Sequence, residues 1–234
     1  MSAIKLLLAG CIAIASFTAT KAQTADEIVK KYIDAIGGAD NWKKVNSIRT
    51  EGSFNVNGSD VSVTVTKLNG KGMRQDISVG GMSGYIIVTP TAGTSFLPFQ
   101  GQTDPKPMPA DVLKDAQDAL DAQGVLLDYK TKGHTVELVG KETIDGAECY
   151  KLKVTLATGK VLTDYINTKT NYLVRYSAKN HNNGQEVEQT VSFGNFQKQP
   201  EGIFVPMTIT QQYGDVTITK VEINKPVDES IFKG

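Results

Sequence analysis

The sequence predicts a mainly β protein of the α+β class, built on one curved antiparallel sheet of about 11–13 strands. Apolar and polar residues alternate with a period of two through most of the chain after position 46. Dipeptides that favour tight hairpins separate these stretches, which predicts antiparallel pairing. Helical spacing occurs in two places, at the start and midway. A sheet this long must curl or split, so the two helices can cover its concave side.

The N-terminal segment contains two competing cleavage signals. Residues 8–11 (LAGC) form a lipobox, which would lipidate Cys11, whereas residues 20–22 (TKA) form an ordinary secretory cleavage site. A signal usually needs an apolar core of about 7–15 residues, and the apolar stretch before Cys11 is too short. We therefore predict a signal peptide over 1–22 and one domain over 23–234, in preference to an outer-membrane lipoprotein. Either route exports the chain, and cleavage after Ala22 predicts a periplasmic protein.

The first helix of the mature chain is predicted over residues 24–36. Thr24 and Glu27 match a capping box, in which each side chain satisfies an exposed backbone donor of the other. Gly37 ends the helix, because glycine accepts the left-handed conformation found at helix C-termini. A short second helical turn around Trp42 is expected to follow. The apolar stripe of the first helix consists of Ile28, Val29, Tyr32, Ile33 and Ile36.

Alternating residues then predict a first run of strands. Asn57-Gly58 and Asn69-Gly70 supply hairpin turns, because both residue types tolerate positive φ. The predicted strands cover 47–56, 61–65, 73–79, 85–88 and 94–99.

A proline-rich segment and a helix interrupt the strands. Pro105, Pro107 and Pro109 predict an irregular segment that cannot donate to a sheet. A helix is predicted over about 110–123, with Gly124 as its end. Its apolar face consists of Val112, Leu113, Ala116, Ala119 and Leu120.

A second run of strands completes the chain. Turns at Asp145-Gly146, Thr158-Gly159 and Gly214-Asp215 again predict a meander. The tail after Pro226 is expected to pack an apolar end against the sheet. The predicted strands cover 136–138, 150–156, 161–166, 172–176, 187–193, 206–213 and 216–223.

Composition excludes several classes of partner. The chain has 25 basic and 25 acidic residues, and no cluster of positive charge that nucleic acid or an anionic membrane surface would need. After the signal, no apolar run approaches the roughly 18 residues of a membrane helix, so no transmembrane segment is expected after cleavage. Cys149 is the one cysteine outside the signal, which precludes an intramolecular disulfide.

The sequence contains no pattern typical of a catalytic or metal site. His134 and His181 are far apart and lack the three or four ligands of a zinc site, so neither a metal nor a cofactor is expected. Residues 80–84 only superficially resemble a nucleophile elbow, because no helix follows. We therefore expect a protein that is not an enzyme. A hydrolase stays open as an alternative if a histidine lies beside a serine or aspartate in a cleft.

Cys149 has two interpretations. It shares a strand face with Lys151 and Lys153, which could lower the pKa of its thiol and make it reactive. The favoured interpretation is a small, half-buried residue at the start of a strand.

Five segments carry a resemblance to a known family. They are 25–38, 45–52, 140–150, 201–206 and 221–232. In these segments the chain resembles the outer-membrane lipoprotein-sorting family, the periplasmic lipoprotein carriers of LolA/LolB-like fold, over nearly all of its mature length. The resemblance implies a half-open β-barrel with an apolar cavity under a helical lid, holding the acyl chains of a lipoprotein. The lid-controlling arginine of those carriers has no clear counterpart, and Arg49 is interpreted as a surface residue.

The candidate lipid-binding residues surround the midway helix. They are expected to line the mouth of the cavity and its lid; the alternative is an ordinary core that fills the barrel. The eight residues are Tyr85, Ile87, Phe96, Leu97, Phe99, Val112, Leu113 and Leu120.

The expected function is that of an exported Gram-negative envelope protein. It would hold a lipoprotein acyl chain, a lipidated protein or another hydrophobic ligand in the concavity of the sheet. The alternative is a sensor or scaffold that binds another envelope protein through the same fold, without lipid.

Overall fold

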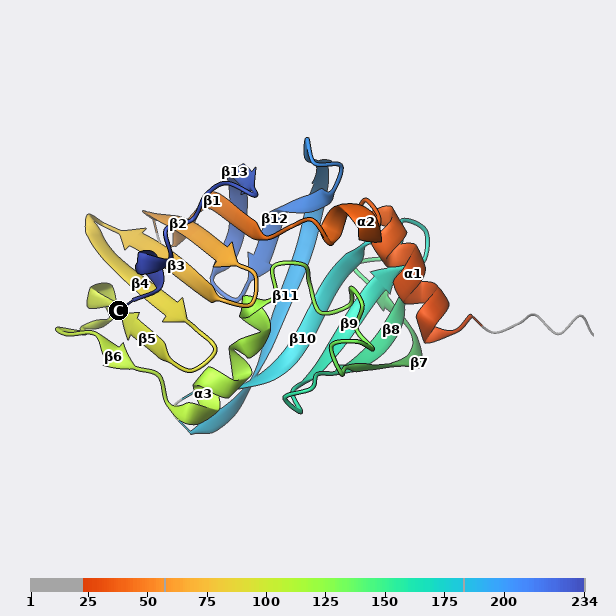
Figure 1. Cartoon of the computed structure of the whole chain (residues 1–234), viewed down its shortest axis with the longest axis horizontal. Helices are drawn as coiled ribbons and strands as arrows, with labels where there is room; N and C mark the ends of the chain where they lie inside the picture. The colour runs from red at the N-terminus through yellow and green to blue at the C-terminus, as the bar shows by residue number, and fades with distance from the viewer. Residues whose placement is uncertain (1–22, 57, 183, 234) are drawn as a thin grey trace, which may run out of the picture.

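The computed structural model describes residues 23–56, 58–182 and 184–233. The predicted signal peptide and Cys11 therefore lie outside the described residues. Within these ranges, thirteen strands form one antiparallel sheet that curves without closing (Figure 1). The half-open barrel and the strand number confirm the predicted fold class.

The N-terminal half of the sheet contains six strands. Its first four hairpins follow the predicted alternation and turns. The strands are β1 (Ser47–Val56), β2 (Ser59–Leu68), β3 (Gly72–Val79), β4 (Met82–Val88), β5 (Gly93–Phe96) and β6 (Lys106–Pro107). The fifth strand is shorter than predicted, because Pro98 begins the 3₁₀ turn η1 (Pro98–Gln100).

The proline-rich segment contributes to the sheet, which corrects the prediction that it could not. Lys106 pairs with Ser95, and Pro107 pairs with Thr94. The pairing is possible because β6 lies at the edge of the sheet and makes hydrogen bonds on one side only.

The C-terminal half of the sheet contains seven longer strands. Their positions confirm the second predicted run, although individual ends differ by a few residues. The predicted Gly214-Asp215 turn is wrong, because both residues lie in the last strand, where they pair with Gln211 and Thr210. The strands are β7 (Thr135–Ile144), β8 (Ala147–Thr155), β9 (Val161–Asn167), β10 (Leu173–Asn182), β11 (Gln185–Lys198), β12 (Phe204–Gln211) and β13 (Gly214–Ile223).

The two halves are joined by the first and last strands. The order of strands across the sheet is β6-β5-β4-β3-β2-β1-β13-β12-β11-β10-β9-β8-β7. Ile48 pairs with Ile223 at one end of the β1–β13 ladder, and a bulge interrupts the ladder between Glu51 and Gly52. Bulges bend a strand and increase its twist, so this one adds to the curvature of the half-barrel.

The N-terminal helix covers the concave side of the C-terminal half. It is α1 (Ala25–Ala35), and the predicted capping box between Thr24 and Glu27 is present. The turn α2 (Ala39–Trp42) follows, and Trp42 donates from Nε1 to the carbonyl of Ile36 at 3.0 Å. The main core forms where α1 and the sheet meet. It includes Ile28, Val29, Ile33, Leu152, Val154, Leu162 and Ile166.

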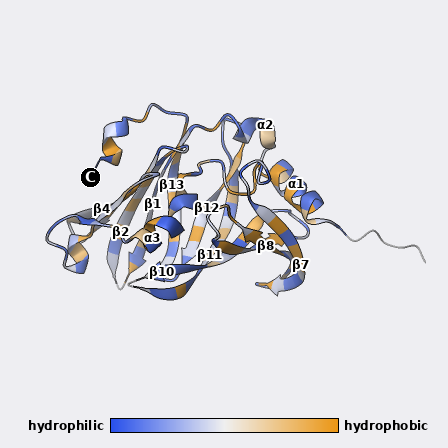
Figure 2. Cartoon of the chain, turned by 60° about the horizontal axis from the view of Figure 1, so that its bottom comes forward, coloured by the Kyte–Doolittle hydropathy of each residue, from blue (hydrophilic) through white to orange (hydrophobic). Residues whose placement is uncertain are grey.

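Figure 2 shows apolar and polar residues following each other along α1 and along the strands. On β8, Leu152 and Val154 are fully buried under α1, while Lys153 between them is exposed. The alternation used to predict the strands therefore also determines which side of the sheet carries the core.

The midway helix is much shorter than predicted. It consists of α3 (Ala110–Asp115) followed by the 3₁₀ turn η2 (Gln117–Leu120). A continuing helix would use the carbonyl of Asp115 to accept the amide of Ala119. That carbonyl instead accepts from Lys160 Nζ at 2.7 Å, and the Ala119 amide donates to Ala116. The contact with Lys160, which lies in the turn before β9, therefore ends the helix early.

The C-terminal tail packs on the outside of β3, as the sequence predicted. Its last turn is η3 (Glu229–Phe232), and Phe232 is buried. A Cβ at Gly72 would lie 2.5 Å from the Phe232 ring, so glycine is required for this contact. Arg74 also donates to the Ile231 carbonyl at 3.0 Å.

Candidate functional site

An apolar groove lies on the concave face, over β1, β2, β3, β12 and β13. Its volume is about 410 Å³. Its polar lining residues are Thr50, Gln75, Gln100 and Gln211. Its apolar lining residues are Phe54, Val56, Val61, Val63, Val65, Ile77, Val79, Phe99, Ile209, Tyr213, Val216 and Ile218. We call this region the apolar groove.

Strand register places these side chains together. Val63 of β2 pairs directly with Gly52 of β1 and with Ile77 of β3. Ile209 of β12 pairs with Val216 of β13. Residues that pair directly point to the same face of a sheet. The intervening residues, such as Ser62, point to the opposite face and are exposed. The groove therefore follows from period-two patterning in five strands.

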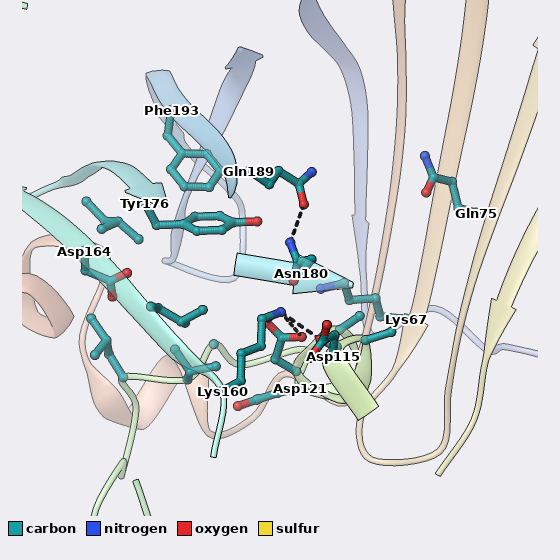
Figure 3. Close-up of a pocket in the computed structure, with 18 of the residues that line it drawn as sticks. Lys67, Gln75, Asp115, Asp121, Lys160, Asp164, Tyr176, Asn180, Gln189 and Phe193 are labelled. Atoms are coloured by element: carbon teal, nitrogen blue, oxygen red, sulfur yellow. Dashed lines mark hydrogen bonds and ion pairs between the residues drawn. The ribbon is translucent and has the colours of Figure 1, made fainter. Parts of the chain in front are cut away.

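A second, polar cavity of about 570 Å³ adjoins the groove, because Gln75 lines both. Its walls come from α1, the α3–η2 segment with the loop after it, and strands β2, β3, β9, β10 and β11. Figure 3 shows its charged side chains, Lys67, Asp115, Asp121, Lys160 and Asp164, together with Tyr176. We call this region the central cavity.

Asp164 occupies an unusual position in the central cavity. It is 2% exposed, and its Oδ2 has no hydrogen-bond partner among the described residues. Burial raises the pKa of Asp164 from 3.8 to about 7. Burial also raises the pKa of the neighbouring Tyr176 to about 12, and the charges of Asp118 and Asp164 add to that shift. An uncompensated acid thus lies inside the barrel.

The other charges of the central cavity have compensating neighbours. Lys160 Nζ lies 3.0 Å from Asp118 Oδ2, and Asp121 Oδ2 lies 2.6 Å from Lys132 Nζ. Burial lowers the pKa of Lys67, while the carboxylates of Asp118 and Asp121 oppose that change. Asp164 is the exception, since no charge contributes to its pKa shift.

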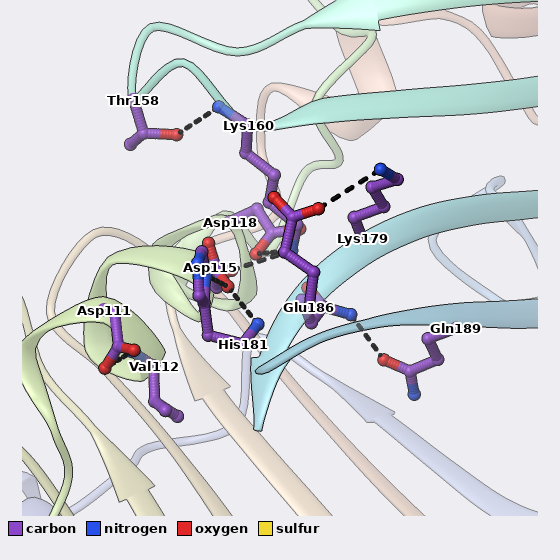
Figure 4. Close-up of polar contacts among 11 residues, drawn as sticks. Asp111, Val112, Asp115, Asp118, Thr158, Lys160, Lys179, His181, Glu186 and Gln189 are labelled. Atoms are coloured by element: carbon purple, nitrogen blue, oxygen red, sulfur yellow. Dashed lines mark hydrogen bonds and ion pairs between the residues drawn. The ribbon is translucent and has the colours of Figure 1, made fainter. Parts of the chain in front are cut away.

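A set of polar contacts holds α3 against β10. The Asp115 Oδ2 atom accepts from the His181 backbone amide at 2.6 Å and lies 2.8 Å from His181 Nδ1 (Figure 4). Lys160 binds the carbonyl of Asp115 and the carboxylate of Asp118. We call the α3–η2 segment the lid, and the four residues Asp115, Asp118, Lys160 and His181 the lid latch. The hydrogen bond that the His181 imidazole donates to Asp115 raises the pKa of His181.

Replacing His181 with alanine is expected to remove a pH-dependent stabilisation of α3. Because the folded state raises the pKa of His181, this stabilisation is complete below about pH 6.5 and is lost as the pH rises through the raised pKa. Hydrogen exchange of the amides in 110–115, corrected for intrinsic rates, should show more protection at about pH 5.5 than at about pH 8. The variant should show no such difference.

His134→Ala is the matched control for this experiment. His134 Nδ1 accepts from the amide of Ala157, away from α3, so the variant should keep the pH dependence of the wild type. Equal protection of α3 at both pH values in the wild-type protein would contradict the latch.

The structure divides the eight predicted lipid-binding residues between the two faces of the sheet. Phe99 lines the apolar groove, and Val112 lines the central cavity. Leu113 and Leu120 pack with Met73 and Val88 in a small core beneath the lid.

Tyr85, Ile87 and Phe96 do not face the helix, which corrects that part of the prediction. Tyr85 pairs with Asp76 and Phe96, and Ile87 pairs with Arg74. The Arg74 guanidinium lies 4.7 Å from the centre of the Tyr85 ring, on the face that carries the C-terminal tail. Leu97 lines neither cavity, and its amide donates to Gln102. The prediction placed Tyr85 and Ile87 on the inner face of β4, whereas Ile86 and Val88 lie on that face.

Two features of the site were not predicted. The aliphatic floor of the groove, including Val63, Ile77 and Ile218, was assigned only to strands. Asp164 was not singled out, although it alternates with Leu162 and Ile166 on a face that the pattern marks as buried.

The described residues assemble no catalytic constellation around the histidines. His181 lies beside Asp115 in the lining of the central cavity, which is the arrangement that the hydrolase alternative required, but no hydroxyl or thiol in the described part of the chain is hydrogen-bonded to either imidazole. No group of three or more His, Cys, Asp or Glu side chains in these residues is placed to hold a metal ion. That the protein is not an enzyme stays a prediction.

Cys149 lies in surroundings that do not activate its thiol. It is fully buried on the convex face beside Ile144 and Tyr165. Burial raises the pKa of its thiol, which is opposite to the lowered pKa of the reactive interpretation. Arg49, as predicted, is a partly exposed outer residue and pairs with Glu51 and Glu222. No helix among the described residues is long and apolar enough to cross a membrane.

The open half-barrel, its apolar concave face and its short helical lid define a protein with the LolA/LolB-like fold. No family model and no curated protein matches the sequence. The structure is similar to that of a LolA superfamily protein from Nitrosomonas europaea, with a TM-score of 0.56 and 15% identity, over 91% of this chain and 99% of that chain.

Two further structures have the same fold. A DUF1329 family protein from Desulfovibrio piger matches with a TM-score of 0.54 and 14% identity, over 89% of this chain and 97% of its own. A domain described as an outer membrane lipoprotein-sorting protein, from Vibrio parahaemolyticus, matches with a TM-score of 0.53 and 14% identity, over 88% of this chain and 95% of its own. At these identities the likeness establishes the fold alone.

Proposed function

We propose that this chain is an exported periplasmic binding protein that holds an acyl chain, or the lipid of a lipidated protein, in the apolar groove. In this proposal residues 1–22 are a signal peptide cleaved after Ala22, and residues 23–234 are the binding domain. The observation that carries the proposal is the groove itself, an unfilled cavity of about 410 Å³ lined mainly by aliphatic and aromatic side chains. A plain core would fill this space with side chains.

The binding energy would come from burying methylene groups. Each buried methylene contributes about 0.8 kcal/mol, so a probe shortened by two methylenes should bind more than tenfold more weakly while the groove is not yet full. A series of fatty acids that compete with a fluorescent acyl probe would measure this dependence.

Replacing Val63 with tryptophan should weaken binding of the fluorescent acyl probe by about tenfold or more. Val63 lies in the floor of the groove, and the larger side chain would occupy space needed by about two methylenes. Fluorescence titration measures the affinity, and thermal unfolding checks that the variant is folded.

Ser62→Trp provides the control for the groove variant. Ser62 precedes Val63 on β2, is exposed and points to the opposite face, so its replacement should change affinity less than about twofold. The proposal fails if the wild-type protein binds no acyl probe, or if a folded V63W protein binds it as tightly as S62W does.

A second candidate function is that of an envelope sensor or scaffold that binds another protein without lipid. One observation favours it: β7 is a free edge of the sheet, and Leu138 and Val139 on it are 37% and 59% exposed. A free edge can accept an extended segment of a partner as an additional strand. Absence of acyl-probe binding, together with crosslinking of a Val139 photoreactive variant to an envelope protein, would favour this function.

A further inference from the structure

We propose that the central cavity is a second ligand site, adjoining the apolar groove, that binds the amine end of a long-chain amphiphile through Asp164. The inference rests on the proposed function, because the alkyl chain of the same ligand would lie in the groove. It adds the chemical class of the ligand, which the groove alone does not determine.

The first argument is the state of the Asp164 side chain. Its carboxylate is 2% exposed, lines the central cavity and has an oxygen without a hydrogen-bond partner among the described residues. A buried polar group left without a partner costs about 1–3 kcal/mol, so proteins rarely retain one without a compensating role. Figure 3 shows the carboxylate turned toward the interior of the cavity, beside Tyr176. A ligand that brings a hydrogen-bond donor would satisfy it.

The second argument is the balance of charge in the cavity. Four aspartates line it, Asp115, Asp118, Asp121 and Asp164, against two lysines. Lys160 is already bound to Asp118, and the carboxylates of Asp118 and Asp121 act on Lys67. The positive charges that an anionic ligand group would need are therefore already balanced by neighbouring carboxylates. A cationic end would find in Asp164 an acid with no competing base.

The third argument is the position of the two cavities relative to each other. Gln75 of β3 lines both the groove and the central cavity. Beyond Gln75 the central cavity reaches Asp164 of β9, where the walls are formed by Tyr32, Leu162 and Leu173. An amphiphile could thus place its chain against β1–β3 and its polar end against β9. The apolar walls around Asp164 would exclude water and strengthen a charge-assisted hydrogen bond.

The test compares amphiphiles that differ only in their polar end. Dodecylamine and dodecanoic acid are titrated separately into the wild-type protein by calorimetry at about pH 7.5, and each also competes with the fluorescent acyl probe. Dodecylamine should bind at least tenfold more tightly than dodecanoic acid, because its ammonium can donate a charge-assisted hydrogen bond to Asp164, whereas a carboxylate has no donor and the same sign of charge as Asp164. Asp164→Asn should reduce this preference by about tenfold and leave the affinity for dodecanoic acid unchanged or improved.

Asp145→Asn controls for the change in net charge. Asp145 pairs with Arg175 on the surface, so the variant should keep the full preference for the amine. The inference is overturned if the wild-type protein binds both compounds equally, or if D164N keeps the preference. These outcomes are separate from failure of the proposed function, in which no alkyl chain of any kind binds to the groove.

Discussion

Replacing Asp164 with asparagine is expected to raise the free energy of unfolding at about pH 8 and to remove most of its fall between about pH 4 and pH 7. In the folded protein the carboxyl keeps its proton up to about pH 7, because burial raises its pKa from 3.8. The unfolded chain releases the proton near 3.8. Over this interval the unfolded state binds fewer protons than the folded state, so stability falls as the pH rises.

The size of the change in stability follows from the difference between the pKa values of Asp164 in the folded and unfolded states. About three pH units correspond to about 4 kcal/mol of lost stability in the wild-type protein at neutral pH. Asparagine removes the charge but still needs hydrogen bonds, so the net gain at about pH 8 should be smaller, about 1–3 kcal/mol. Urea unfolding of both proteins across the pH range measures the difference.

Asp145→Asn is again the control, because Asp145 is exposed and its replacement should preserve the pH dependence of the wild type. A wild-type protein whose stability is flat between about pH 4 and pH 7, or rises there, would show that Asp164 is not held uncompensated in the folded state.

Replacing Gly37 with alanine is expected to lower the free energy of unfolding by about 2–5 kcal/mol. Gly37 follows α1 with φ of 115°, where a side chain is strained. A Cβ at this position would also lie 2.3 Å from the Gly202 carbonyl oxygen and 2.7 Å from the Ile203 Cα. Both are backbone atoms in the turn before β12, so relief would require α1 to move away from the sheet. Urea unfolding would give the loss directly.

Gly38→Ala distinguishes the cost of backbone strain from the cost of a steric clash. Gly38 also has positive φ, 85°, but a Cβ there would have no atom within 4 Å. Gly38→Ala should therefore cost only about 1–2 kcal/mol. If G37A and G38A proved equally stable, the close contact between α1 and the β11–β12 connection would not be a determinant of stability.

Some features of the fold could be predicted from the sequence, and others could not. The strands could be predicted, because alternation in β1, β2 and β8 reflects one buried face and needs no knowledge of distant partners. The burial of Asp164 is indicated by the same alternation, between Leu162 and Ile166, but no role was assigned to this residue from the sequence. A polar residue that interrupts an apolar face is thus the signal that could have located the central cavity.

The remaining errors come from contacts between distant parts of the chain. The end of α3 depends on Lys160, 45 positions away from the carbonyl that it binds. The assignment of Tyr85 to the outer face depends on pairing with β3 and on the C-terminal tail above Arg74. Local spacing contains no information about either contact, so the extent of the lid and the composition of its surroundings could not be predicted from the residues alone.

The pairing of β1 with β13 sets an order of events for folding. β1 is the first strand of the sheet in chain order and β13 is the last, yet the two strands pair with each other in the middle of the sheet. Until β13 arrives, β1 presents a free edge, and the two groups of strands on either side can form only as separate hairpin meanders. Contacts between such distant segments slow folding. The half-barrel must therefore remain in two incomplete parts, with the floor of the apolar groove exposed, until β13 has paired with β1.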